Sequence, residues 1–190
     1  MRQNNDTLNI LNQQLSNVST ENQFITFKIG SETYGINIML VQEIIRYNKP
    51  TEVYNANPVI KGLINFRGQV IPIIDMHKKF NLEGQNYDKF TVVIVFEVDS
   101  KTMGMIVDRV SDIISFRNED IQTVDQEFAE DIKTEHLQGI AKNEEDIVLL
   151  LNPKRVLTFS ELEKIEDYKD ENVKSKSINE NNGGNNDESQ

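Results

Sequence analysis

FITFKIGSETYGINIMLVQEII, residues 24–45, is the stretch that decides the fold, because the chain repeats it. Moved forward by 69 positions, it falls without a gap on VIVFEVDSKTMGMIVDRVSDII, residues 93–114. Phe27 then meets Phe96, and Gly35 meets Gly104. A second stretch, IKGLINFRGQVIPIIDMHKKF (60–80), aligns in the same way with LQGIAKNEEDIVLLLNPKRVL (137–157). The chain therefore holds two copies of one small unit, with a seam between them.

Composition limits the classes of protein to which the chain can belong. At 190 residues it is one domain or two small, closely associated ones. The absence of cysteine excludes disulfides and thiol catalysis and suits the cytosol. No apolar run is long enough to cross a membrane, and the N-terminus lacks the pattern of a signal peptide. The net charge of −11 argues against a nucleic-acid partner.

Alternating apolar residues and turn signals predict an all-β fold. Residues 22–29 alternate and then meet Gly30-Ser31, and Gly68 suits a tight turn between two further strands. About five short strands per copy predict two five-stranded β-barrels, about 24–80 and 93–157, around a shared hydrophobic seam. A short helical turn is expected near Ile38, and a C-terminal helix is expected to begin at Asn152 and Pro153.

The two ends of the chain differ from this ordered part. Residues 1–21 are rich in Asn and Gln and are expected to be a flexible leader or a short amphipathic helix. The domain itself is expected to cover residues 22–168. Residues 169–190 hold few apolar side chains, so we expect a disordered, acidic, Asn-rich tail.

A search for reaction chemistry finds no motif. The two histidines, His77 and His136, have no metal-ligand spacing, and His77 is expected in a surface turn. Phosphate-binding loops and nucleophile motifs are absent from the sequence. Carboxylates such as Asp75 and Asp108 are most simply strand-end residues. We therefore expect no catalysis, no metal and no cofactor.

Apolar residues beside the seam are the remaining candidates. Each of two repeat-matched triplets can be core, but a part of each at the seam would form a groove for an amphipathic helix: Val41, Ile44, Ile45 and Val110, Ile113, Ile114. Each triplet has an acid between its members, Glu43 in the first copy and Asp112 in the second. Arg67, in its tight turn, is either a solvated turn residue or the partner of a carboxylate such as Glu43.

These motifs, taken in order, resemble the CheW-like family of bacterial chemotaxis coupling proteins. The most specific pieces are the repeated stretch around Tyr34-Gly35-Ile36, the run VQEI (41–44), the turn NFRG (65–68), VIPIID (70–75) and VDRVSD (107–112). The resemblance covers about residues 22–160 in one colinear run. It implies two SH3-like barrels that share a seam, and no catalysis.

The resemblance also implies partners and contact residues. Members of the family link the cytoplasmic hairpin tip of chemoreceptors to the regulatory domain of the histidine kinase CheA, without inserting into the membrane, in arrays at the inner membrane. By that likeness, receptor contact carries over to Val41, Glu43, Ile44, Arg67, Val110 and Ile113. Kinase contact carries over to Thr91, Val92 and Phe128. Gln122 stands where family members often carry a basic residue, which is a departure from the family pattern in the segment before Phe128.

Other interpretations remain open at this point. A paralogous coupler for another pathway of the same kinase type, such as surface motility or biofilm control, would have the same sequence features. A small-molecule or oligonucleotide-binding double barrel would want a basic or aromatic face, whereas tryptophan is absent and acids prevail. An enzyme would need a carboxylate with a perturbed pKa in a cleft.

Overall fold

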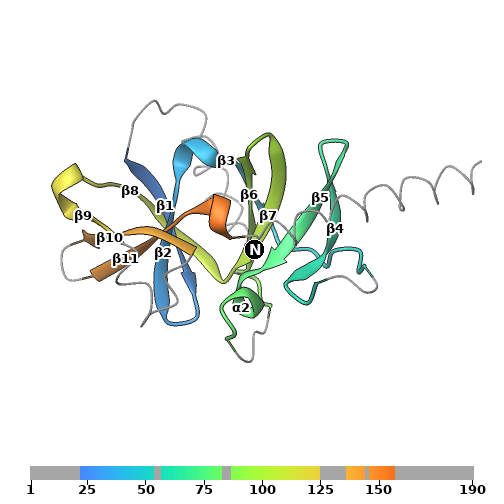
Figure 1. Ribbon diagram of the computed structural model, residues 1–190. Coiled ribbons are helices and arrows are strands. Elements are labelled where there is room, and N and C mark those ends of the chain that lie inside the picture. Colours follow the sequence, from blue (N-terminus) through green and yellow to red (C-terminus); the bar gives the residue numbers. More distant parts are fainter. Residues whose placement is uncertain (1–21, 54–56, 83–86, 125–135, 144–145, 157–190) are drawn as a thin grey trace, which may run out of the picture.

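The computed structural model describes residues 22–53, 57–82, 87–124, 136–143 and 146–156. The first copy of the repeat folds as five strands and two short helical segments: β1 (Gln23–Ile29), β2 (Glu32–Asn37), η1 (Ile38–Leu40), β3 (Val41–Arg46), β4 (Ile60–Phe66), β5 (Gln69–Asp75) and α2 (Met76–Lys79). The second copy has one more short strand, β9, and its first helical segment follows its third strand: β6 (Val92–Val98), β7 (Lys101–Val107), β8 (Arg109–Ser115), η2 (Asn118–Asp120), β9 (Ile121–Thr123), β10 (Leu137–Asn143), β11 (Asp146–Leu151) and η5 (Pro153–Arg155). Figure 1 shows the strands as two curved groups beside each other.

Tight turns at the predicted places close the hairpins. Gly30 has a φ of 60°, and Arg67 and Gly68 have φ values of 51° and 86°. In the β4–β5 turn both central residues, Arg67 and Gly68, have positive φ, which matches the twist of the flanking strands. The Oδ1 atom of Asn65 accepts a hydrogen bond from the Gly68 amide at 2.9 Å, which holds the β4–β5 turn. The sequence prediction of these hairpins is confirmed.

The two sheets exchange strands between the copies of the repeat. Sheet A has the order β8-β1-β2-β11-β10-β9, and sheet B has the order β3-β6-β7-β5-β4. Each sheet thus combines strands from both copies, and the predicted barrel boundaries, 24–80 and 93–157, are wrong. The sequence pattern predicts which neighbouring strands form a hairpin. It does not predict the pairing of strands from different copies, because these strands are far apart along the chain. The predicted all-β class, with two SH3-like units, is confirmed, although the ladders are not fully closed.

Four strand pairs join the two copies: β1–β8 and β3–β6 are antiparallel, and β5–β7 and β2–β11 are parallel. The two parallel pairs are related by the repeat. Ile73 of β5 lies opposite Gly104 of β7, and Leu150 of β11 lies opposite Gly35 of β2. A Cβ atom at Gly104 would lie 2.6 Å from side-chain atoms of both Ile73 and Val93. The repeated glycine therefore makes room for the strand that arrives from the other copy.

Bent edge strands curl each sheet. Thr51 follows β3 and pairs with Leu63 of β4, so the chain at one edge of sheet B reaches the opposite edge. Gln122 of β9 pairs with Ile140 of β10 in the equivalent place of sheet A. Beside these contacts, a Cβ atom at Gly62 would lie 2.3 Å from the Thr51 carbonyl oxygen. A side chain is excluded there because the crossing backbone occupies its space.

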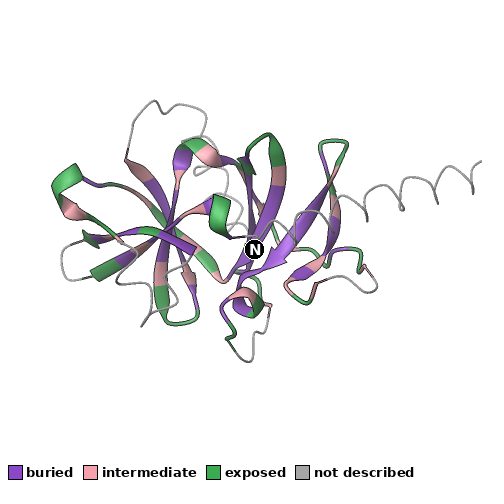
Figure 2. Ribbon diagram, in the orientation of Figure 1, coloured by how far each residue is buried: buried purple, intermediate pink, exposed green. Residues whose placement is uncertain are grey.

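Buried side chains form three clusters, and the largest takes its members from both sheets. Figure 2 shows that buried residues run along strands of both groups. One face of β1 and one face of β6 enter this central cluster, with both repeat-matched phenylalanines fully buried: Ile25, Phe27 and Ile29; Ile94, Phe96 and Val98. The other faces fill the two smaller clusters, one inside each curved sheet. Burying one such phenylalanine contributes roughly 1.5–3 kcal/mol. The shared hydrophobic seam of the prediction is this central cluster.

Polar caps end the last strand of each copy. The Asp75 side chain accepts a hydrogen bond from the Lys78 amide at the start of α2, and Asn152 accepts one from the Lys154 amide at the start of η5. The predicted helix start at Asn152 and Pro153 is therefore present as η5. The remainder of the expected C-terminal helix, the leader 1–21 and the tail 169–190 lie outside the described residues.

Candidate functional site

An ion pair joins β3, an edge strand of sheet B, to the turn between β4 and β5. The Arg67 Nη2 atom lies 2.7 Å from the Glu43 Oε2 atom, and the guanidinium also lies 5.1 Å from the centre of the Phe66 ring. Their side chains are 70% and 29% exposed, so the pair lies at the surface. The predicted partnership of Arg67 with Glu43 is present. At this exposure the pair contributes at most about 1 kcal/mol to folding, which leaves its charges available to a partner.

Half-buried apolar side chains of β8 border the same central cluster. Val110 and Ile113 pack against that cluster without being covered, and they lie opposite Phe27 and Ile25 of β1. On sheet B, Val41 at the start of β3 is 9% exposed. We name these three residues with Glu43 and Arg67 the seam surface. Because β3 and β8 are the edge strands of different sheets, only the tertiary fold brings both to one cluster.

Val41 and Ile44 are both buried members of the central cluster, unlike the other predicted receptor-contact residues, and Ile44 is the more completely covered of the two. Its side chain is 1% exposed and belongs to the central cluster, so it has no accessible surface for a partner. Its repeat mate, Ile113, stays half-buried. The repeat does not predict this difference, because the exposure of each residue depends on which strand of the other copy covers it.

The predicted kinase-contact residues are also buried. Thr91 is 4% exposed and Val92 is 5% exposed. The Thr91 hydroxyl accepts a hydrogen bond from the Asp88 amide at 3.0 Å, and the Thr91 carbonyl accepts one from the Tyr47 amide at 3.2 Å. These two residues therefore hold the start of β6 in place. The third residue, Phe128, lies outside the described residues.

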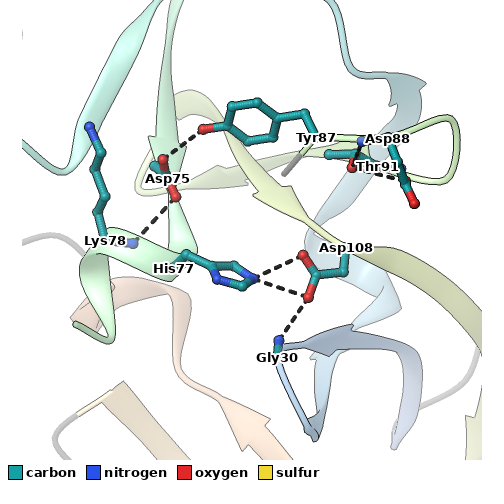
Figure 3. Close-up of polar contacts among 8 residues, drawn as sticks. All are labelled: Gly30, Asp75, His77, Lys78, Tyr87, Asp88, Thr91 and Asp108. Atoms are coloured by element: carbon teal, nitrogen blue, oxygen red, sulfur yellow. Dashed lines mark hydrogen bonds and ion pairs between the residues drawn. The ribbon is translucent and has the colours of Figure 1, made fainter. Parts of the chain in front are cut away.

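Two tyrosines hold the segment before β6 against sheet B. The Tyr87 hydroxyl donates a hydrogen bond to the Asp75 Oδ2 atom at 2.8 Å (Figure 3). The Tyr87 ring stacks on the Tyr47 ring, with the ring centres 4.3 Å apart. Burial, and then the hydrogen bond to Asp75, raises the pKa of Tyr87 far above its usual value. Asp75 thus anchors both α2 and the segment that leads to Thr91.

His77 connects the two sheets, which corrects the expectation of a surface turn. It is 8% exposed, and its Nε2 atom lies 2.9 Å from the Asp108 Oδ1 atom. The Asp108 Oδ2 atom also accepts a hydrogen bond from the Gly30 amide at 2.7 Å (Figure 3). Sequence reasoning missed this contact because Asp108 lies in the other copy of the repeat.

The described residues contain no group of three or more metal-ligating side chains. None of the helices among them is long and apolar enough to span a membrane.

Comparison with known proteins gives consistent matches. The family model for the CheW-like domain matches residues 23–161. A chemotaxis protein CheW from Klebsiella aerogenes is 38% identical over 149 residues, which are 78% of this chain and 89% of that protein. The CheW of Treponema pallidum is 29% identical over 147 residues, 75% of this chain and 86% of that one. The crystal structure of the scaffolding protein TtCheW from Thermoanaerobacter tengcongensis superimposes with a TM-score of 0.65 at 27% identity, covering 70% of this chain and 90% of that chain.

Proposed function

Because the chain belongs to the family of CheW-like domains, we propose that it is a non-enzymatic adaptor of chemotaxis signalling, which couples chemoreceptors to a histidine kinase of the CheA type. The family match covers most of the chain, and the relatives match along most of their own length. The adaptor works in the cytoplasm at receptor arrays. It needs no cofactor, because its action is to hold two partners in a fixed geometry.

The seam surface is the receptor-binding site in this proposal. An amphipathic helix at a receptor's hairpin tip would lay its apolar face on Val110 and Ile113, beside Val41. Arg67 and Glu43 would offer one charge of each sign to the polar residues at the edge of that helix. Ile44 supports this surface from the core, rather than contacting the partner.

The kinase partner binds at the start of β6 in this proposal, around Thr91 and Val92. The observation that carries the coupling is the pairing of β3 with β6, in which Arg46 lies opposite Val92 and Glu43 lies opposite Val95. The receptor-facing strand and the kinase-facing strand are thus hydrogen-bonded neighbours. A shift of one strand is therefore transmitted directly to the other, and couplings of this kind are typically worth about 1–3 kcal/mol.

Binding of a receptor signalling tip tests the seam surface. We expect Arg67→Ala and Val110→Lys each to weaken capture of a receptor cytoplasmic fragment by about tenfold or more. Both side chains are partly exposed, so circular dichroism should show a folded protein. Arg117→Ala is the matched control, since Arg117 is 77% exposed, pairs with Glu119 and Asp120, and is not one of the residues of the seam surface. Folded variants that both bind like the unchanged protein would refute the assignment.

A further inference from the structure

Three residues from separate parts of the chain form a polar contact between the two sheets. Asp108 joins β7 of sheet B to β8 of sheet A, and its carboxylate lies between two donors. The His77 Nε2 atom, from α2 after β5 of sheet B, lies 2.9 Å from Asp108 Oδ1 and 3.0 Å from Oδ2. On the other side, the Gly30 amide in the β1–β2 turn of sheet A donates to Oδ2 at 2.7 Å (Figure 3). We name Gly30, His77 and Asp108 the polar bridge, because they join α2 of one sheet to a turn of the other.

The polar bridge is largely shielded from solvent. The side chains of His77 and Asp108 are 10% and 30% exposed. A hydrogen bond to a carboxylate is roughly twice as strong as one between neutral groups, and burial limits its screening by water. The Asp108 amide also donates a hydrogen bond to the Lys28 carbonyl at 3.0 Å. Both the side chain and the backbone of Asp108 are therefore held directly before β8 begins.

The repeat places a second contact at the equivalent position, and that contact is exposed. Lys154 of η5 is the repeat mate of His77, and Asp99 of the β6–β7 turn is the repeat mate of Gly30. The Lys154 Nζ atom lies 2.6 Å from the Asp99 Oδ1 atom, with both side chains 66% exposed. An ion pair this exposed contributes little to stability, because water and salt screen its charges. The two contacts thus join the same kinds of element, but only the polar bridge is shielded.

A pocket of ≈ 250 Å³ separates the two sheets beside the polar bridge. Its lining includes Gly30 and Arg109 on the side of sheet A, and Phe90 and Thr91 directly before β6 of sheet B, with Asp108 between them. Protein side chains therefore do not fill the space between the sheets here. The central cluster holds the sheets together elsewhere, but the hydrophobic effect has no preferred direction. Hydrogen bonds weaken steeply when their angle changes, so the polar bridge constrains how the sheets are oriented.

We propose that the polar bridge fixes the angle between the two sheets and so sets the distance across the seam surface. Val110 of the seam surface follows Asp108 by two residues, whereas Val41 and Arg67 lie on sheet B. A rotation of one sheet against the other would therefore move Val110 relative to those two residues. His77 and Asp108 are positioning residues, which do not themselves contact the receptor helix. This inference rests on the proposed function, because it names what positions the same receptor-binding site.

The orientation of the sheets in solution, measured by NMR residual dipolar couplings on the full chain, tests the proposal directly. His77→Leu keeps a side chain of similar size but removes the donor to Asp108, whereas His77→Gln retains a donor in the place of Nε2. We expect the orientation of sheet A relative to sheet B to change in His77→Leu and to be restored in His77→Gln. Lys154→Ala is the matched control, because it removes the exposed contact that the repeat relates to the polar bridge.

Capture of a receptor cytoplasmic fragment by the same variants connects that orientation to the seam surface. We expect His77→Leu to weaken capture by about fivefold, His77→Gln to restore it and Lys154→Ala to leave it unchanged. Asp108→Asn keeps the shape of the side chain and removes its charge, so this second variant should weaken capture in the same way. Circular dichroism of each variant identifies any loss that comes from unfolding.

The outcomes separate this inference from the proposed function. A changed orientation with weaker capture in His77→Leu, both restored in His77→Gln, supports the polar bridge. An unchanged orientation in folded His77→Leu and Asp108→Asn overturns it, and so does a changed orientation with full capture; both results leave the adaptor function standing. Failure of the unchanged protein to capture the fragment overturns the proposed function, and the dipolar couplings then still decide whether the polar bridge fixes the sheets.

Discussion

Gly62→Ala should break the contact between Thr51 and β4, the edge strand of sheet B that leads into the Arg67 turn. A Cβ atom at this position would lie 2.3 Å from the Thr51 carbonyl oxygen. This oxygen belongs to the backbone, so the clash cannot be relieved by rotating a side chain. Gly62 also has a φ of 152°, a backbone conformation that residues other than glycine rarely adopt. The strands must therefore separate, or the bulge between Ile60 and Gly62 must rearrange.

The expected cost follows from what separation breaks. Thr51 and Leu63 exchange two backbone hydrogen bonds of 2.9 Å, each worth about 1 kcal/mol net. Forcing an alanine into this backbone conformation adds at least about 1 kcal/mol. We therefore expect Gly62→Ala to lower the free energy of unfolding by about 3 kcal/mol, a large part of the typical stability of a domain.

Gly68→Ala separates the two contributions to this cost. Gly68 also has a positive φ, 86°, but a Cβ atom there would meet nothing within 4 Å. This control should lose only about 1 kcal/mol, from backbone strain. Urea unfolding followed by circular dichroism and tyrosine fluorescence gives both values, since the chain has no tryptophan.

The difference in unfolding free energy between Gly62→Ala and Gly68→Ala tests whether the backbone at Thr51 constrains position 62. If Gly62→Ala costs no more than Gly68→Ala, the crossing backbone at Thr51 does not constrain this position. If it costs about 3 kcal/mol, the folded fraction should still show weaker receptor capture, because the loosened edge carries the Arg67 side of the seam surface.

Three further predictions concern polar contacts. Tyr87→Phe removes a phenol whose pKa is raised above its ordinary 10.0. The free energy of unfolding of the unchanged protein should therefore fall as the pH rises above that value, and the variant should lose less stability over the same pH range, as measured by urea unfolding. Asp108→Ala should speed hydrogen exchange at the Gly30 amide by about fivefold or more, seen by NMR, and an unchanged rate would mean that this contact is absent in solution. Glu43→Gln should change the free energy of unfolding by less than about 1 kcal/mol while weakening receptor capture, because its partner is largely solvated.

Local features of the fold were predictable from the sequence. Alternation and turn chemistry predicted the hairpins, including the turn in which Gly68 has a positive φ, whereas the positive φ of Arg67 was not predicted. The same reasoning suggested the pairing of Arg67 with Glu43, because an arginine in a tight turn and a carboxylate among apolar residues both need a polar partner. These features depend on residues that lie close along the chain or on the chemistry of single side chains.

The sequence alone also determined that two copies of one unit share a hydrophobic seam, because the apolar pattern repeats through residues 24–45 and 93–114. Only the tertiary structure decided which strands share a sheet, since alternation says which face is apolar but not which strand lies beside it. That choice buried Ile44, Thr91 and Val92 and left Phe90 outside. The physical reason is that exposure is a property of the packed neighbours, and here the neighbours come from the other copy of the repeat.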